Sequence, residues 1–147
     1  MLDLGTSFVA SVARDPEALA IVDDDLRLTY AQWYRRISSL IASFDRIGLK
    51  PGDHIVTVLQ NCEPAATLHW ACQLAGIVIT PINWRAKDDE LDFCIENSEA
   101  CAVVYRTSPR KPSKIQGERR PCRAFASAMS EPVNSTSSNL RQNQRQI

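Results

Sequence analysis

The sequence predicts an α/β fold with a short parallel β-sheet, flanking helices and an N-terminal β-hairpin. Short runs of β-branched and apolar residues alternate with longer amphipathic stretches between residues 54 and 105. Glycine, proline and aspartate stand between these segments, where turns are expected. The chain has 147 residues, of which 44% are hydrophobic, so it is long and apolar enough to form the core of one domain.

The first predicted elements are a helix and a β-hairpin. A short amphipathic helix is expected over residues 6–14, with Thr6 or Ser7 as its N-cap. Apolar strands follow at residues 18–22 and 26–28, on either side of Asp23-Asp24-Asp25. Aspartate favours turns because its carboxylate accepts hydrogen bonds from nearby backbone N–H groups. The spacing therefore predicts an antiparallel hairpin.

A long amphipathic helix is predicted over residues 30–47. Thr29 precedes it as an N-cap, Gly48 follows it as a left-handed cap, and Pro51-Gly52 forms the next turn. Spacings of three and four residues place its apolar side chains on one face. These side chains are Trp33, Ile37, Leu40, Ile41 and Phe44.

The next segments alternate between strand and helix. Strands are predicted at 54–59 (HIVTVL), 77–80 and 101–105, with Pro81 ending the second. Helices are predicted from about 61 to 75, capped by Gly76, and from 88 to 97, where acidic residues in the first turn suit the helix dipole. This alternation predicts right-handed crossovers and a parallel sheet.

The composition changes abruptly after Tyr105. Residues 1–105 carry 8 Lys and Arg against 15 Asp and Glu, whereas residues 106–147 carry 9 against 2. The second segment is rich in Ser, Pro, Arg, Asn and Gln, and it has too little apolar surface to offset the entropy of ordering. We predict a globular region over 1–105 and a disordered basic tail over 106–147. A shifted reading frame is one hypothesis for the tail.

The cysteine, histidine and hydropathy patterns argue against a zinc protein, a disulfide-bonded protein and a membrane-spanning protein. The five cysteines are widely spaced and form no CxxC pair, and His54 and His69 do not complete a zinc pattern, so no metal site is expected. We interpret the cysteines as reduced, mostly buried thiols. No uninterrupted run of about 20 apolar residues exists, and the N-terminus does not resemble a secretion signal, so a cytoplasmic location is expected.

Two stretches resemble one family of enzymes. LRLTYAQWYRRISSLIASFDRIGLKPGDHIVTVLQN contains, in order, Leu-Thr-Tyr, a helix, Gly, Pro-Gly-Asp and a strand that ends near Asn. CQLAGIVITPINWRAKDDEL contains a helix-ending Gly, a short strand, Pro, Asn and Arg before an acidic helix start. In this order they resemble the N-terminal region of adenylate-forming, AMP-dependent acyl-CoA synthetases, over about residues 18–105. The triplet Asn83-Trp84-Arg85 is more typical of fatty or aromatic acyl-CoA ligases than of peptide synthetase modules.

The resemblance implies that a carboxylic acid is activated with ATP and magnesium to an acyl-adenylate and then transferred to CoA. The family's phosphate loop and catalytic residues lie downstream in its members, and nothing like them occurs in this sequence. The resemblance therefore implies a truncated N-terminal subdomain, inactive alone, with no catalytic residues and no cofactor expected to bind the fragment. Arg85 matches an Arg that approaches a CoA phosphate in some relatives. The alternative for Arg85 is an exposed structural residue paired with Asp88 or Asp89.

Other functional classes remain open on the sequence. The chain could be a noncatalytic module that binds the other half of a split ligase, or nucleic acid through its basic tail. The tail lacks the interleaved aromatic residues that stack on bases, so nucleic-acid binding is less favoured. An exposed sheet edge would also favour self-association. A minor alternative is a receiver-like signalling domain, in which Asp23-Asp24-Asp25 would follow a strand and bind magnesium.

Overall fold

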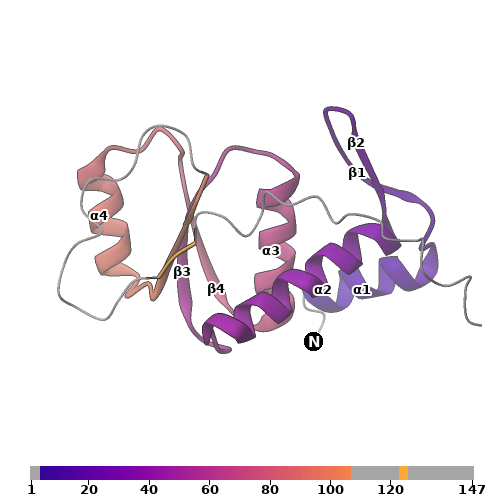
Figure 1. Cartoon of the computed structure of the whole chain (residues 1–147), viewed down its shortest axis with the longest axis horizontal. Coiled ribbons are helices and arrows are strands. Elements are labelled where there is room, and N and C mark those ends of the chain that lie inside the picture. The colour runs from indigo at the N-terminus through magenta and orange to yellow at the C-terminus, as the bar shows by residue number, and fades with distance from the viewer. Residues whose placement is uncertain (1–3, 107–122, 126–147) are drawn as a thin grey trace, which may run out of the picture.

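The computed structural model describes residues 4–106 and 123–125 (Figure 1). It confirms the predicted α/β class, with a two-stranded hairpin and a separate sheet of parallel strands. The elements in chain order are α1 (Leu4–Arg14), β1 (Leu19–Asp23), β2 (Leu26–Thr29), α2 (Tyr30–Ile47), β3 (His54–Val58), α3 (Glu63–Ala75), β4 (Val78–Ile82), α4 (Asp88–Asn97), β5 (Ala102–Tyr105) and β6 (Arg123–Phe125).

The larger sheet has the strand order β4-β3-β5-β6, and each recorded pairing in it is parallel. Strand β3 is central, because Val56 lies opposite Thr80 of β4 on one side and Val103 of β5 on the other. The chain therefore moves from β3 to β4 through α3, and back across β3 to β5 through α4. This is the arrangement that the alternation of strands and helices predicted.

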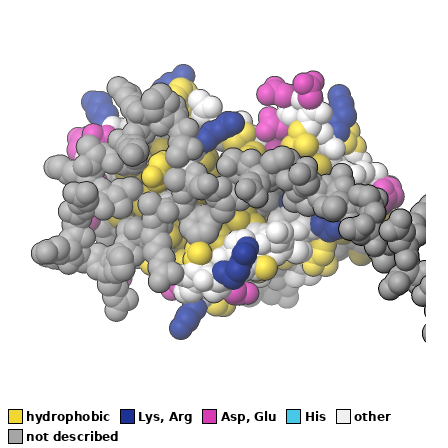
Figure 2. Space-filling model, in the orientation of Figure 1, with side chains coloured by type: hydrophobic (Ala, Val, Ile, Leu, Met, Phe, Trp, Pro, Cys, Tyr) yellow, Lys and Arg dark blue, Asp and Glu magenta, His cyan; other side chains and the backbone are white. Residues whose placement is uncertain are grey.

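The hairpin joins β1 and β2 in antiparallel register, with Asp23 opposite Leu26. Asp24 in its turn has φ 49, in the left-handed region where a short polar side chain is tolerated. Figure 2 shows acidic side chains gathered at the tip of this hairpin. The acidic triplet therefore ends an antiparallel hairpin strand and not a strand of the parallel sheet, unlike the arrangement that a receiver-like site requires.

Helix α2 begins and ends where its caps predicted. Thr29 Oγ1 accepts a hydrogen bond from Gln32 N at 3.3 Å, and Gln32 Oε1 accepts one from Thr29 N at 2.9 Å. This reciprocal pair is a capping box. At the other end Gly48 has φ 79 and donates its N–H to the Asp45 carbonyl at 3.0 Å. The sequence chemistry of these two ends thus fixes the helix length.

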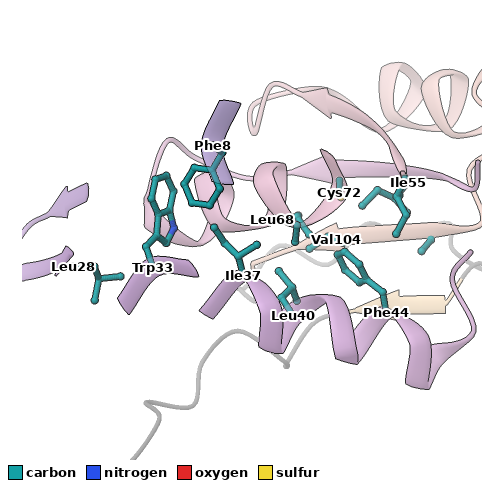
Figure 3. Packing of buried hydrophobic residues seen from close by; sticks show 13 residues of the cluster. Phe8, Leu28, Trp33, Ile37, Leu40, Phe44, Ile55, Leu68, Cys72 and Val104 are labelled. Atoms are coloured by element: carbon teal, nitrogen blue, oxygen red, sulfur yellow. The ribbon is translucent and has the colours of Figure 1, made fainter. Parts of the chain in front are cut away.

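The main core runs along α2 from the hairpin to the sheet (Figure 3). The buried residues of α2 are spaced by three or four, as predicted: Trp33, Ile37, Leu40 and Phe44. Ile37 is fully buried, and burial of a side chain of this size contributes about 1.5–3 kcal/mol. Leu28 of β2 and Ile55 of β3 belong to the same cluster, so α2 connects the hairpin to the sheet.

Helices α3 and α4 cover opposite faces of the sheet. Leu68 of α3 shares a cluster with Ile55, whereas Leu91 of α4 shares one with Val56 and Val103. Successive side chains along a strand point to opposite faces, so Ile55 and Val56 face opposite helices. Figure 1 shows α4 on one side of the strands and α2 and α3 on the other.

Several predicted boundaries differ from the structure by one or two residues, and two of the differences, in α1 and β4, have a clear physical reason. Helix α1 begins at Leu4, so Ser7 lies in its first turn and donates its hydroxyl to the Leu4 carbonyl at 2.8 Å instead of capping the helix. Strand β4 continues through Pro81, which pairs in register with Thr57. Val78 N donates to the Asp53 carbonyl at 2.9 Å, and N–H groups alternate in direction along a strand. Pro81 N therefore points away from β3, where no ladder bond is lost.

Most of the segment predicted as a disordered tail, residues 107–122 and 126–147, lies outside the described residues. Residues 123–125 differ from that prediction, because they form β6 beside β5, with Val103 opposite Ala124. Parallel pairing with the outer edge of β5 supplies backbone partners that the sequence of this segment does not reveal.

Candidate functional site

The carboxyl ends of β3 and β4 are neighbours, and the chain leaves them toward opposite faces of the sheet. Residues 59–62 lead from β3 to α3, and residues 83–87 lead from β4 to α4. We call these two segments the β3–β4 loop pair. Open parallel sheets bind ligands beyond the strand ends at such a divergence. Gln60, Asn61 and the triplet 83–85 are exposed there, so this loop pair is the candidate site.

The turn after β4 is fixed by Asn83. Its Oδ1 accepts the backbone N–H of Arg85 at 3.0 Å, and its carbonyl accepts the N–H of Ala86 at 2.8 Å. An Asn side chain that bonds the backbone two residues later forms an Asx turn. The backbone of Arg85 is therefore held in one direction, and only its side chain remains to be oriented.

The side chain of Arg85 stacks on Trp84. Its Cζ lies 3.9 Å from the centroid of the indole ring, which is cation–π geometry. Trp84 is 43% exposed, so the stacked pair stands at the surface. Among the described residues, an ion pair joins Arg36 and Glu63. The contact that the structure shows for the Arg85 guanidinium is therefore the indole ring of Trp84, and pairing with an acidic residue of α4 stays the predicted alternative.

The other loop of the pair is anchored where α3 begins. Cys62 occupies the N-cap of α3 but makes no side-chain capping bond. Asp23, 40 residues earlier at the end of β1, supplies the bond instead, because its Oδ2 accepts the N–H of Glu63 at 2.6 Å. A carboxylate at a helix N-terminus also interacts favourably with the helix dipole. The hairpin thus caps α3 from a distance and fixes the end of the β3 loop.

A buried polar chain ties α2 to the same helix start. The side chain of Glu63 is 6% exposed and pairs with Arg36 at 3.2 Å. Thr67 Oγ1 donates to Glu63 Oε1 at 2.6 Å and accepts the Trp33 Nε1–H at 2.8 Å. Buried charges are tolerated when they are paired and hydrogen-bonded, and this carboxylate has both kinds of partner. The network is therefore structural, and it holds the start of α3 against α2.

The remaining ionisable candidates lie away from the loop pair. His69 is half-buried on α3, with its ring edge against Trp70 at 5.8 Å between centroids. The carbonyl of His54 at the start of β3 accepts the Cys101 N–H at 2.9 Å. Burial raises the pKa of the Cys72 thiol to about 12, and the pKa of Cys101 is also raised, first by burial and then by Asp53. Neither thiol is activated as a nucleophile.

A groove of about 570 Å³ lies between α1 and α3, far from the loop pair in sequence. Its lining contains Val9, Ala13, Gln73 and Leu74, and none of the lining residues is ionisable. We therefore assign no catalytic or charge-binding role to this groove.

None of the helices in the described part of the chain is both long and apolar enough to cross a membrane.

Sequence reasoning found Arg85 but missed the residues that orient it and the neighbouring loop. The roles of Asp23 and Glu63 depend on partners 40 and 27 residues away. One signal in the sequence could have indicated a distant cap for α3. Cys62, at the N-cap position before Glu63, is not a residue type that caps helices well. Trp84 was visible as part of the triplet, but its contact with Arg85 was not.

Comparisons with known proteins agree on one family. The family described as AMP-binding enzyme matches residues 8–145. A feruloyl-CoA synthase from Amycolatopsis sp is 30% identical over 102 residues, which cover 69% of this chain and 21% of that protein. The mitochondrial medium-chain acyl-CoA ligase ACSF2 from Danio rerio is 30% identical over 100 residues, which cover 67% of this chain and 16% of that protein.

Solved structures share the fold. A protein provisionally assigned as a long-chain-fatty-acid CoA ligase, from Rhodopseudomonas palustris, has a TM-score of 0.73 at 25% identity, over 86% of this chain and 33% of that one. The NpsA N-terminal subdomain from Klebsiella oxytoca has a TM-score of 0.75 at 17% identity, over 86% and 32%. The chain thus spans only a minor part of the length of the relatives that it matches.

Proposed function

Because this chain belongs to the AMP-binding enzyme family, we propose that it is the N-terminal part of an ATP-dependent acyl-CoA ligase. In the reaction of such a ligase, a carboxylate oxygen attacks the α-phosphorus of ATP, and pyrophosphate leaves. The CoA sulfur then attacks the acyl carbonyl carbon, and AMP leaves with the bonding electron pair. The thioester is the product of the second step.

The acyl substrate that we propose is a fatty or aromatic carboxylic acid. Two relatives that are each 30% identical to the matched part of this chain are a feruloyl-CoA synthase and a medium-chain acyl-CoA ligase. The triplet Asn83-Trp84-Arg85 at the carboxyl end of β4 supports a CoA ligase over a peptide synthetase module. The observation that carries the proposal is the family match over residues 8–145, together with an exposed Arg85 whose guanidinium lies over the Trp84 ring.

The residues present fit CoA better than they fit ATP or magnesium. A guanidinium that is exposed and held by an aromatic ring suits a phosphate group, and we assign Arg85 to a phosphate of CoA. Residues 4–106 contain no loop rich in Gly, Ser and Thr with a Lys after a strand. Within the described residues, no group of three or more His, Cys, Asp or Glu could hold a metal ion. We derive no step through ATP or magnesium from these residues.

We further propose that this chain does not complete either chemical step alone. This rests on the small share of each relative that it spans and on the lack of catalytic residues in its sequence. The DNA beyond the Tyr105 codon provides a direct check in all three reading frames. A phosphate loop and the rest of a ligase in another frame would support a frameshifted or truncated gene. An uninterrupted frame through residue 147 with no ligase sequence in the other frames would contradict a frameshifted or truncated gene, and the activity assays below test the inactivity itself.

Activity assays test the proposal. The purified chain is incubated with ATP, magnesium, CoA and either ferulate or a medium-chain fatty acid, and pyrophosphate and thioester are measured. We expect neither product from the chain alone, and both after a polypeptide with the downstream part of a related ligase is added. Thioester formation by the chain alone would contradict the proposed inactivity. A complex with the downstream polypeptide that remains inactive with every acid would contradict the ligase assignment.

A second candidate function is a noncatalytic module that binds a partner. The observation in its favour is the free edge of β4, which within the described residues pairs only with β3 and bears Val78 at 44% exposure. The partner that we propose is the remainder of a split ligase, with a second copy of this chain as the competing occupant. Light scattering of the chain alone and with the downstream polypeptide separates the two.

The proposal includes a cytoplasmic location, which the four free thiols of the described region support.

A further inference from the structure

We propose that Trp84 is a positioning residue that presents the Arg85 guanidinium to an anionic group of CoA and keeps it from the acidic first turn of α4. This inference rests on the proposed function, because it concerns the same site. Three observations carry it: the stacked geometry, the fixed backbone of the turn, and the negative charge close by in the sequence.

The stacking leaves the guanidinium available for a ligand. The Arg85 Cζ lies over the indole ring, 3.9 Å from its centroid, and a guanidinium that stacks on an aromatic ring makes the contact with its flat face. Its five N–H donors lie in the plane and at the edge of the group, where a phosphate binds in a bidentate manner. Trp84 therefore orders the side chain without consuming the donors that an anion needs.

The backbone of Arg85 is held in place, so only its side chain can change orientation. Asn83 holds the N–H of Arg85 and that of Ala86 in one turn, at 3.0 and 2.8 Å. The side chain of Arg85 contacts the indole ring, and the carboxylates that begin α4, three to five residues later in the sequence, are the competing partners. Because the backbone turn stays fixed, we expect loss of the ring contact to let the guanidinium turn toward these carboxylates.

The acidic competitor is built into α4. Asp88, Asp89 and Glu90 form its first turn, within five residues of Arg85. Glu90 is already engaged, because its Oε2 accepts the Lys87 N–H at 2.9 Å. Asp89 is exposed. An exposed ion pair between Arg85 and Asp89 is of the same order of energy as an exposed cation–π contact. The contact with Trp84 thus favours an Arg85 guanidinium that is available to a ligand over one that is paired with a carboxylate of this chain.

The test compares CoA binding by the full chain and its variants, using calorimetry at low salt. Trp84→Ala is expected to raise the Kd about two- to fivefold, the factor that an exposed cation–π contact is worth. Trp84→Phe keeps an aromatic face and is expected to retain most of the affinity. Asp89→Asn in the Trp84→Ala background is expected to restore part of it. Phe93→Ala is the matched control, since Phe93 is also an exposed aromatic residue, at 65%, and lies outside the loop pair.

A second readout does not require a ligand. In NMR spectra of the full chain, the Arg85 side-chain protons should show an upfield ring-current shift, which Trp84→Ala removes and Phe93→Ala does not. Unchanged CoA affinity in Trp84→Ala, while Arg85→Gln still weakens binding, overturns the positioning role and leaves the proposed function intact. Absence of CoA binding by the unsubstituted chain overturns the CoA contact of the proposed function and this inference together.

Discussion

Thr67 is the residue on which the buried polar network depends, because one hydroxyl serves two buried groups. Replacing it with Val keeps the shape but removes both hydrogen bonds. The Trp33 indole N–H then has no partner in a residue that is 7% exposed, and Glu63 Oε1 loses a bond of 2.6 Å. An unsatisfied buried donor costs about 1–3 kcal/mol, and a lost bond to a charged group about 1.5–3 kcal/mol. We therefore expect Thr67→Val to lower the free energy of unfolding by about 2.5–6 kcal/mol.

Urea denaturation followed by far-ultraviolet circular dichroism measures this cost. The matched control is Thr67→Ser, which keeps the hydroxyl and loses one methyl group, worth about 0.8 kcal/mol. If Thr67→Val does not fold, the same substitution in a Trp33→Phe background isolates the indole, because no N–H is then left unsatisfied. Free energies of unfolding that agree within about 1 kcal/mol between Thr67→Val and Thr67→Ser would refute this role of Thr67, because the network would then contribute nothing beyond packing.

Three further predictions concern packing, backbone and a thiol. Phe8→Ala removes the ring that stacks on Trp70 at 4.7 Å between centroids, and should cost about 3–5 kcal/mol of unfolding free energy, whereas Val9→Ala, at an exposed position, should cost far less. Gly48→Ala should lower the thermal midpoint, since φ 79 costs an L-residue about 1–2 kcal/mol, and Gly48→Asn should lower it less. Burial raises the pKa of Cys72 to about 12 from 9.0 in the free thiol, so its contribution to stability is complete below pH 9 and is lost toward pH 12. In urea titrations at several pH values, Cys72→Ala should reduce the loss of unfolding free energy between pH 9 and pH 12. An unchanged dependence of the unfolding free energy on pH would contradict the burial argument.

The sequence predicts correctly the bounds of an element whose capping residues lie next to its own ends. Helix α2 was predicted over 30–47, as observed, because Thr29, Gln32 and Gly48 act within one turn of the helix ends. The order of strands and helices followed from periodicity, and the parallel sheet followed from that order. Where the prediction stopped β4 at Pro81, it treated proline as a strand breaker. The edge position of β4 among the described strands removes the reason for that rule.

The contacts that organise the candidate site could not be read from the sequence, because they join distant segments. Asp23 looked like a turn residue and is also the cap of α3, 40 residues later. Trp33 looked like a core residue and also donates to Thr67, 34 residues later. Local reasoning assigns each residue one role from its neighbours, whereas tertiary packing gives a polar group at the rim of the core a second partner. Arg85 shows the same limit at short range, since spacing alone allowed both an acidic partner and an aromatic one.

The most direct test of the account is a titration of the isotopically labelled full chain with CoA, with each backbone amide followed by NMR. We predict that shifts concentrate in the β3–β4 loop pair, with Arg85 and Trp84 among the largest, and that dephospho-CoA or inorganic phosphate reproduces only part of them. Shifts confined to the groove between α1 and α3, or none at millimolar CoA, would contradict the assignment of this sheet end as the CoA-binding site.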